Sequence, residues 1–521
     1  MTRLSEQRQP NQPHNNPRHI RVAGTDRIYD RNRLLLVLLV PLMMTMIQVS
    51  SVTNILPSLG EALDASPSQL QWVLSGYALA LGIVLVPSGR LGDMFGRSTV
   101  FVIGSVIFSL ASLLVGLATS APMLNVMRVL QGFGAGVLSP QTTGLIQQYF
   151  VGQARAKAFA LFGLVVSMSV ATGPVMSGVL IAMLGPDQGW RWSFIINFPL
   201  GVVGIIMAIK WLPFGKERRH VGRKKKQARH EYLTMKKAEG QEVKPTKIDL
   251  DPVGMVLLAF SVLAIMLPFM GQQPAWMWLL FPLGLLLLSA WYFWEKKYKA
   301  RGREPMVDLE LFRIKTFSYA TAIAAVMFLG STSIFVVLAL FLQNGMDVSA
   351  LDYGLMVLPN ALVSAIAAVW AGKRAVVHGR GVQVIALVLM LVGIIGSLLL
   401  MWGLDFGISY WWLMLPLAIL GFGQGAMGSA NQTQSMLDVP AEHGGTAGGV
   451  MQTAQRIATA IGNAVITAVF LLGIRWYAGD QGYYFGVIIS FLLIIAFVMI
   501  ALVLALIFWR DGYRQRHAQA V

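Results

Sequence analysis

Ionisable residues that could carry protons, bind metals or perform catalysis are unevenly placed along this chain. It contains 24 Asp and Glu residues, 7 His and no Cys among 521 residues. All the carboxylates and histidines fall in predicted loops, in tails or at the ends of predicted helices. Acid–base or metal chemistry needs several such groups close together. We therefore expect no catalytic residues, no metal site and no cofactor, and an enzyme is the least supported class.

Two charged residues lie instead inside long apolar segments, and both are basic: Arg128 and Arg456. A charge at membrane depth is costly, so each side chain should face protein or water. Without acidic partners, a cavity that contains both would repel organic cations. Neutral or acidic amphipaths, including lipid-like molecules, are the predicted ligands. For Arg128 an alternative remains, in which it only bonds the carbonyls of neighbouring helices.

Uncharged polar residues within the same apolar segments are further candidates for lining a substrate cavity. They are Gln48, Asn54, Tyr77, Gln131, Asn360, Gln424, Asn431 and Gln452, with Gln455 and Asn463 as weaker candidates. Buried polar groups need hydrogen-bond partners, so we expect roughly half of these side chains to bridge helices instead.

The elements that carry these residues are predicted to be membrane helices. The chain is 55% hydrophobic and only 12% charged, whereas a soluble protein has about a quarter charged residues. This composition excludes a soluble globule, a disordered chain and a nucleic-acid-binding domain. In lipid the backbone must satisfy its own hydrogen bonds, which favours helices of about 20 apolar residues. Fourteen such runs are present, at 34–56, 70–89, 99–119, 122–149, 157–185, 193–213, 252–270, 275–294, 317–342, 353–372, 382–402, 409–431, 445–473 and 484–509.

Basic residues predict the orientation of these helices. Of the 41 Lys and Arg residues, 37 lie in segments that the fourteen-helix map places on one side of the membrane. Loops rich in Lys and Arg face the cytoplasm. We therefore expect both termini in the cytoplasm and the chain in the inner membrane. The basic cluster at 223–226 is explained by this topology or by anionic lipid, and we expect no nucleic-acid partner.

The helices divide into groups of six, two and six. An all-α membrane protein is predicted in which two six-helix bundles face each other across a cavity, with an inserted helix pair. The predicted units are a poorly ordered cytoplasmic tail 1–33, an N-terminal bundle 34–213, a basic loop 214–250, the inserted pair 251–294, a linker 295–316, a C-terminal bundle 317–509 and a tail 510–521.

A short motif after the second helix is the most specific signal. It comprises Gly89, Asp93, Gly96 and Arg97. Small residues permit a tight turn, and the two charged residues can pair and cap a neighbouring helix. We expect a loop that acts as a conformational latch. A similar but weaker motif is present at 372–380, where Val376 replaces the Asp.

These residues resemble the major facilitator superfamily. The Gly89–Arg97 motif resembles its signature loop, and Arg128 with Gln131 resembles its helix-4 arginine motif. The glycines and proline Gly173, Pro174 and Gly178 look like its antiporter motif, which is associated in the family with export. The stretch 190–201 resembles the fourteen-helix drug/proton antiporters, the EmrB/QacA-like branch.

The resemblance implies a secondary exporter of an amphipathic small molecule. One position in the first predicted helix departs from the pattern of that branch. Helix 1 has Gln48 where that branch usually carries an Asp, and an amide cannot take up a proton. Either protons are handled at the membrane edge, with Asp93 or Asp352 as candidates, or transport is not proton-driven. The alternative function is an exporter or flippase of a lipid or cell-envelope precursor, which a crevice open to lipid would favour. We expect a monomer surrounded by membrane lipids.

Overall fold

The structure is a computed structural model that describes residues 19–21, 28–214, 250–270, 273–404, 407–477 and 480–520. Most of the predicted tail 1–33 and of the basic loop 214–250, including the cluster at 223–226, lies outside the described residues.

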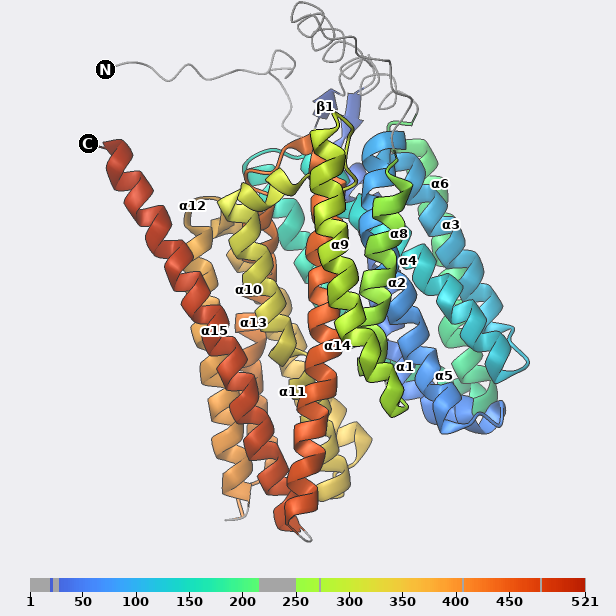
Figure 1. Cartoon of the computed structure of the whole chain (residues 1–521). Helices are drawn as coiled ribbons and strands as arrows, with labels where there is room; N and C mark the ends of the chain where they lie inside the picture. Colours follow the sequence, from blue (N-terminus) through green and yellow to red (C-terminus); the bar gives the residue numbers. More distant parts are fainter. Residues whose placement is uncertain are drawn as a thin grey trace, which may run out of the picture.

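The first group of helices forms one side of the molecule (Figure 1). Its members are α1 (Arg31–Ala62), α2 (Pro67–Phe95), α3 (Arg97–Gly116), α4 (Ala121–Tyr149), α5 (Gln153–Ile195) and α6 (Asn197–Trp211). Local signals fix where they begin. At the start of α2, Ser66 and Gln69 form a reciprocal capping box and Pro67 occupies the first turn, where no N–H is needed. We call residues 31–211 the N-terminal half.

The last group lies on the opposite side and is called the C-terminal half (Figure 1). It comprises α10 (Lys315–Ser331), α11 (Ser333–Ala339), the π-helical turn η4 (Leu340–Gly345), α12 (Ala350–Gly403), η6 (Tyr410–Leu413), α13 (Met414–Ser435), η7 (Ala441–His443), α14 (Gly444–Trp476) and α15 (Asp480–Ala520). Between the halves run α8 (Pro252–Met266), η1 (Leu267–Phe269), η2 (Ala275–Leu279), α9 (Leu280–Ala300) and η3 (Leu309–Arg313).

Eleven helices of the described chain are long and apolar enough to cross a membrane. Two of these spans are far longer than one crossing requires: Gln153–Trp211 has 59 residues and Asp352–Gly403 has 52. Each is interrupted by non-helical backbone, at Gly185 and at His378 respectively. The described chain is therefore an all-helical membrane protein apart from one small pair of strands.

Three local features differ from the sequence-based expectations. The motif expected as a loop is mostly helix, since α2 continues to Phe95 and only Gly96, at φ 104°, turns the chain into α3. Two antiparallel strands, β1 (His19–Arg21) and β2 (Ile28–Asp30), lie within the predicted tail. Helix α9 continues to Ala300, six residues beyond its predicted end, which places Glu295 inside the helix.

The inserted helices cover the line along which the two halves meet. Strand β1 and the last residues of α15 lie at the same end of the molecule, which we call the termini end (Figure 1). Helix α8 packs against both α2 and α14, and α9 packs against α8. A Cβ on Gly82 of α2 would contact Met266 of α8 at 3.1 Å. The α2–α14 seam is therefore screened from lipid by α8.

Candidate functional site

Asp93, near the end of α2, joins the two halves at the termini end. Its carboxylate pairs with Arg97, whose Nη2 lies 2.7 Å from Oδ1. It also accepts hydrogen bonds from the backbone N–H groups of Gly445 and Thr446, at 3.1 and 2.9 Å, and from the Thr446 hydroxyl at 2.7 Å. Unpaired N–H groups and the helix dipole make the first turn of α14 a good partner for a carboxylate.

Arg97 extends this contact to other segments. Its Nη2 donates to the carbonyl of Ala441 at 2.6 Å, and its Nη1 donates to the carbonyl of Gly144 on α4 at 2.7 Å. The side chain is only 4% exposed. The guanidinium thus links α2, α4 and the segment before α14 through charge-assisted bonds, which are stronger than neutral ones. We call Asp93, Arg97 and Thr446 the latch.

Close backbone packing brings these groups together. A Cβ on Gly89 would lie 2.5 Å from the carbonyl oxygen of Gly445, and a Cβ on Gly449 would lie 2.6 Å from that of Leu85. Neither distance is possible for a real side chain without movement of a helix. The glycines of the motif and of the run before Arg456 therefore set the contact distance between α2 and α14.

Further hydrogen bonds join the halves from the termini end to the middle. Gln147 donates to the carbonyls of Met436 and Val439 at 2.8 and 2.7 Å. The hydroxyl of Ser139 on α4 donates to Gln452 on α14 at 2.6 Å. On the α5–α12 seam, the hydroxyls of Ser167 and Ser364 are 2.9 Å apart. The structure is thus closed at the termini end, and both seams are packed there.

Arg128 has the geometry of a residue that joins helices. It is 1% exposed, and its Nε donates to the carbonyl of Val73 on α2 at 2.9 Å. Its Nη1 donates to Gln131 at 2.5 Å, and Gln131 in turn donates to Ser112 on α3. The guanidinium also lies over the ring of Tyr77, 4.4 Å from its centroid. Its Nε and Nη1 groups are thus bonded to α2 and α4 of the same half.

Arg456 differs, although it is also basic and also lies within a helix. It is half-buried on α14 and makes no hydrogen bond or ion pair with any residue that the structure describes. It lies within electrostatic range of Tyr77 across the seam. The Tyr77 hydroxyl is buried and has no hydrogen-bond partner in the described structure. The structure therefore brings Tyr77 near both of the arginines that the sequence singled out.

The candidates on α1 contact neighbouring helices. Gln48 is fully buried, and its Oε1 accepts a hydrogen bond from Asn197 on α6 at 2.6 Å, while its Nε2 has no partner. Asn54 is exposed and donates to the carbonyl of Pro174 and to Ser177 on α5, both at 3.2 Å. Gly173 contacts α1 so closely that a Cβ there would meet Ser50. Gly178 lies beside Asn54, so the antiporter motif packs directly on α1.

The candidates of the C-terminal half are not gathered in one place. Asn360 on α12 donates to the carbonyl of Leu417 and to Gln424 on α13, at 2.9 and 3.3 Å. Asn431 accepts a hydrogen bond from Gln383 at 2.9 Å. These bonds tie α12 to α13. Gln452 alone among them reaches the other half, through Ser139.

Two buried carboxyl groups form a pair that the sequence did not suggest. Asp251 caps α8, accepting from the N–H of Gly254 at 2.9 Å and from Nε1 of Trp294 at 2.8 Å. Glu295 on α9 is also fully buried and lies beside the backbone of Met306 and Val307 and the side chain of Trp291. Gly254 lies against both carboxyls. The Asp-x-x-Gly spacing in the sequence could have indicated the helix cap at Asp251. Only the packing of α8 on α9 brings Glu295 next to Asp251.

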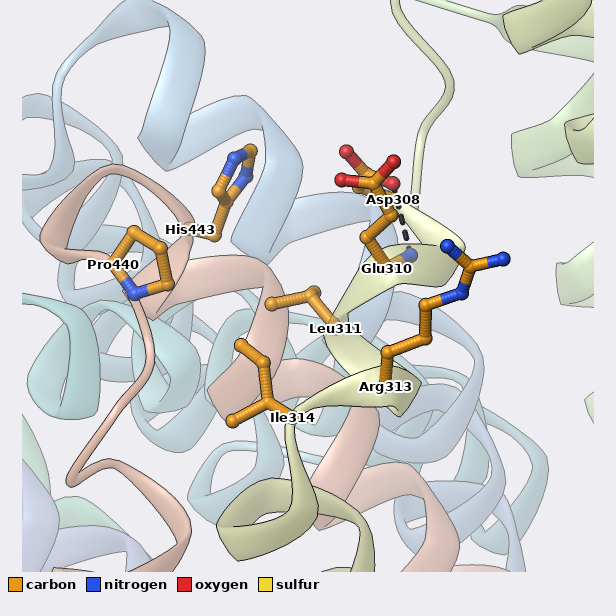
Figure 2. A pocket seen from close by; sticks show the side chains of 7 residues that line it. All are labelled: Asp308, Glu310, Leu311, Arg313, Ile314, Pro440 and His443. Atoms are coloured by element: carbon orange, nitrogen blue, oxygen red, sulfur yellow. Dashed lines mark hydrogen bonds between the residues drawn. The ribbon is translucent and has the colours of Figure 1, made fainter. Parts of the chain in front are cut away.

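A pocket of about 480 Å³ lies at the termini end rather than at mid-depth. Figure 2 shows its lining, which comes from the η3 region and from the segment before α14: Asp308, Glu310, Leu311, Arg313, Ile314, Pro440 and His443. Lys299 at the end of α9 bridges Asp308 and Glu310, at 2.8 Å to each. Burial opposes the charge of Asp308, but the hydrogen bonds from Lys299 and from the Glu310 backbone outweigh it and lower the pKa of Asp308.

Known proteins resemble this chain in sequence and in fold. The "Probable actinorhodin transporter" of Streptomyces coelicolor is 31% identical over 430 residues, which cover 80% of this chain and 69% of that protein. The "Tetracenomycin C resistance and export protein" of Streptomyces glaucescens is 27% identical over 441 residues, covering 83% and 74%. The proton:xylose symporter XylE has the same fold, with a TM-score of 0.60, 13% identity and coverage of 92% and 95%.

A family profile also matches this chain, in two overlapping segments. The profile described as Major Facilitator Superfamily matches residues 38–273 and again 251–463. Together the two matches span most of both halves and the inserted pair. The chain therefore belongs to the Major Facilitator Superfamily, a family of membrane transporters.

Proposed function

We propose that this protein exports an amphipathic small molecule, a drug-like compound or a metabolite, from the cytoplasm by alternating access. The similarity to exporters named for actinorhodin and tetracenomycin C supports export of such a molecule. The observation that carries the mechanism is the latch, because the hydrogen bonds that Asp93 and Arg97 make to the other half can break and re-form. In this proposal the latch closes the cytoplasmic side while substrate leaves on the other.

The proposal includes a topology of fourteen helices in the inner membrane, as in the EmrB/QacA-like branch. The two long spans, each broken near its middle, and α4, which is 29 residues long, support that count. The basic loops support an orientation with the termini end in the cytoplasm. The α2–α14 seam is covered by α8, which argues against loading of a lipid substrate through that side.

Antiport against protons is part of the proposal, with Asp93 as the proton-handling residue. It is the carboxylate that bonds both halves, so its protonation would weaken the Thr446 contact and favour opening. Export could then be linked to proton entry without an acidic residue in helix 1.

The experiment uses inverted membrane vesicles from cells that produce the full chain. A fluorescent polycyclic dye should accumulate inside them when a proton gradient is imposed, and an uncoupler should stop this accumulation. Vesicles with Asp93→Asn serve as the matched control, because this variant keeps the side-chain shape but cannot ionise. Accumulation equal to that of vesicles without the protein, over a panel of dyes, would contradict export. Accumulation that an uncoupler leaves unchanged would contradict proton antiport alone.

A further inference from the structure

The α2–α14 seam brings Arg456 near Tyr77. Gly445 contacts Gly89, and Gly449 contacts Leu85, so four residues forward on α14 correspond to four residues back on α2. The two helices are thus antiparallel with a fixed register. Seven further residues in the same register bring Arg456 level with Ala78, the neighbour of Tyr77. This position agrees with the electrostatic interaction between the two side chains.

Arg456 is a cation near the middle of a membrane helix without a partner in the described protein. It lies about 18 Å along α14 from Gly444, at 1.5 Å per residue, in a helix of 33 residues. An unpaired charge at this depth is costly, and such residues mark ligand or ion pathways. Arg128 provides the contrast, because it donates hydrogen bonds to Val73 and Gln131.

Tyr77 supplies a second group without a partner. Its side chain is 3% exposed, and the Arg128 guanidinium lies over its ring. Its hydroxyl can donate one hydrogen bond and currently donates none to the described protein. A cation and a hydroxyl donor, one from each half, therefore lie within electrostatic range of each other, and no described residue accepts a hydrogen bond from either.

We propose that Arg456 and Tyr77 form an acid-binding subsite that takes the carboxylate or similar anionic group of an amphipathic ligand. The planar guanidinium can hold two oxygens of such a group, and the tyrosine hydroxyl can donate to one of them. A ligand bound there contacts both halves at once. The subsite rests on the proposed export function, which it deepens by naming an acidic substrate class.

The test compares two ligands that differ only in charge, anthracene-2-carboxylate and its carboxamide. Binding of each to the full chain in phosphatidylcholine nanodiscs is followed by fluorescence. Wild type should prefer the carboxylate. Arg456→Gln should weaken carboxylate binding about tenfold, or about 1.4 kcal/mol, and leave carboxamide binding unchanged. Tyr77→Phe should weaken carboxylate binding less, and Arg456→Lys should retain part of it.

Arg475→Gln is the matched control, since it removes the same charge from an exposed position on the same helix. It should leave both affinities unchanged. Adding phosphatidylglycerol distinguishes the source of the acid. If this anionic lipid displaces the carboxylate from wild type, a lipid headgroup occupies the subsite, and if it does not, the subsite takes a soluble acid.

Two results would contradict the proposed acid-binding subsite. In the first, the carboxylate binds wild type no better than the carboxamide, whatever the absolute affinity. In the second, Arg456→Gln weakens both ligands equally, which assigns Arg456 a structural role. Either result leaves dye export by inverted vesicles intact. Failure of the proposed export function would instead show as vesicles that accumulate no dye.

Discussion

The carboxylate of Asp93 on α2 and the hydroxyl of Thr446 on α14 are 2.7 Å apart, although 353 positions separate the residues in sequence. The backbone N–H of Thr446 donates to the same carboxylate oxygen, and Arg97 pairs with the other. Each half thus contributes to a polar contact that the other half completes. Its strength should govern how often the termini end opens.

Replacing Asp93 with Asn should open that end more often. The change removes the charge from four bonds, and hydrogen bonds to a charged group contribute about 1.5–3 kcal/mol each. A single cysteine at Ser139, which lies deeper on the same side, reports opening through its reaction with a thiol reagent, and the chain has no native Cys. We expect the rate to rise about tenfold, since this corresponds to about 1.4 kcal/mol.

Glu442→Gln is the control for that experiment, because Glu442 contributes only its backbone carbonyl to Arg97. It should leave the thiol reaction rate unchanged. A rate in Asp93→Asn equal to the wild-type rate would show that the latch does not hold the closed state.

Replacing Arg128 with Gln should destabilise the protein without changing its preference for charged ligands. The variant loses the bond to the Val73 carbonyl and the contact with the Tyr77 ring, both fully buried. The Val73 carbonyl keeps its hydrogen bond within α2, so the cost is the loss of a hydrogen bond to a charged group, about 1.5–3 kcal/mol. Thermal unfolding in detergent measures the loss, and the carboxylate and carboxamide affinities should fall together. If the affinity fell for the carboxylate ligand alone, Arg128 would instead belong to the ligand site.

Replacing Gln48 with Asp should make transport depend on pH. The wild-type amide is fully buried and bonded to Asn197, so it contributes no titrating group. A carboxyl at this position can ionise, and an unpaired buried charge is costly. We expect export in inverted vesicles to vary with pH in Gln48→Asp but much less in Gln48→Asn, which is shorter but stays neutral. Equal pH profiles for the two variants would contradict this prediction.

Replacing Asp308 with Asn should lower stability by the same small amount at all pH values above about 5. The pKa of Asp308 is lowered on folding, so its ionised form adds stability above the ordinary pKa of about 3.9. That contribution is lost only as the pH falls through the lower folded value. Because the pair with Lys299 is partly exposed, the melting temperature should drop by roughly 2 °C or less.

Melting curves of wild type and Asp308→Asn at about pH 6, 8 and 3.5 check this sign. The two proteins should differ by the same amount at the first two values and by less at the third. A difference that grows on acidification would mean that folding raises the pKa of this carboxyl. Glu310→Gln, which affects a more exposed partner of the same lysine, provides a comparison.

Several features followed from the sequence because they depend on local composition. Apolar runs predicted almost all of the helices, since burial of about 20 consecutive residues in lipid needs no information about partners. The motif at Gly89–Arg97 could be located and related to a family by its spacing alone. Its form was not predicted correctly, because a glycine with positive φ allows a one-residue turn where a loop is the usual expectation.

The partners of the polar side chains were decided only by the tertiary structure. Arg128 and Arg456 are the same residue type in similar apolar surroundings, yet one is satisfied by neighbouring helices and the other is not. Glu295 looked like a linker residue until α9 was seen to continue past it and bury it beside Asp251. Hydropathy is a property of one segment, whereas a hydrogen bond depends on the register between helices far apart in the chain. For that reason the sequence determined where the membrane helices lie, and only their packing determined which polar groups remain without a partner.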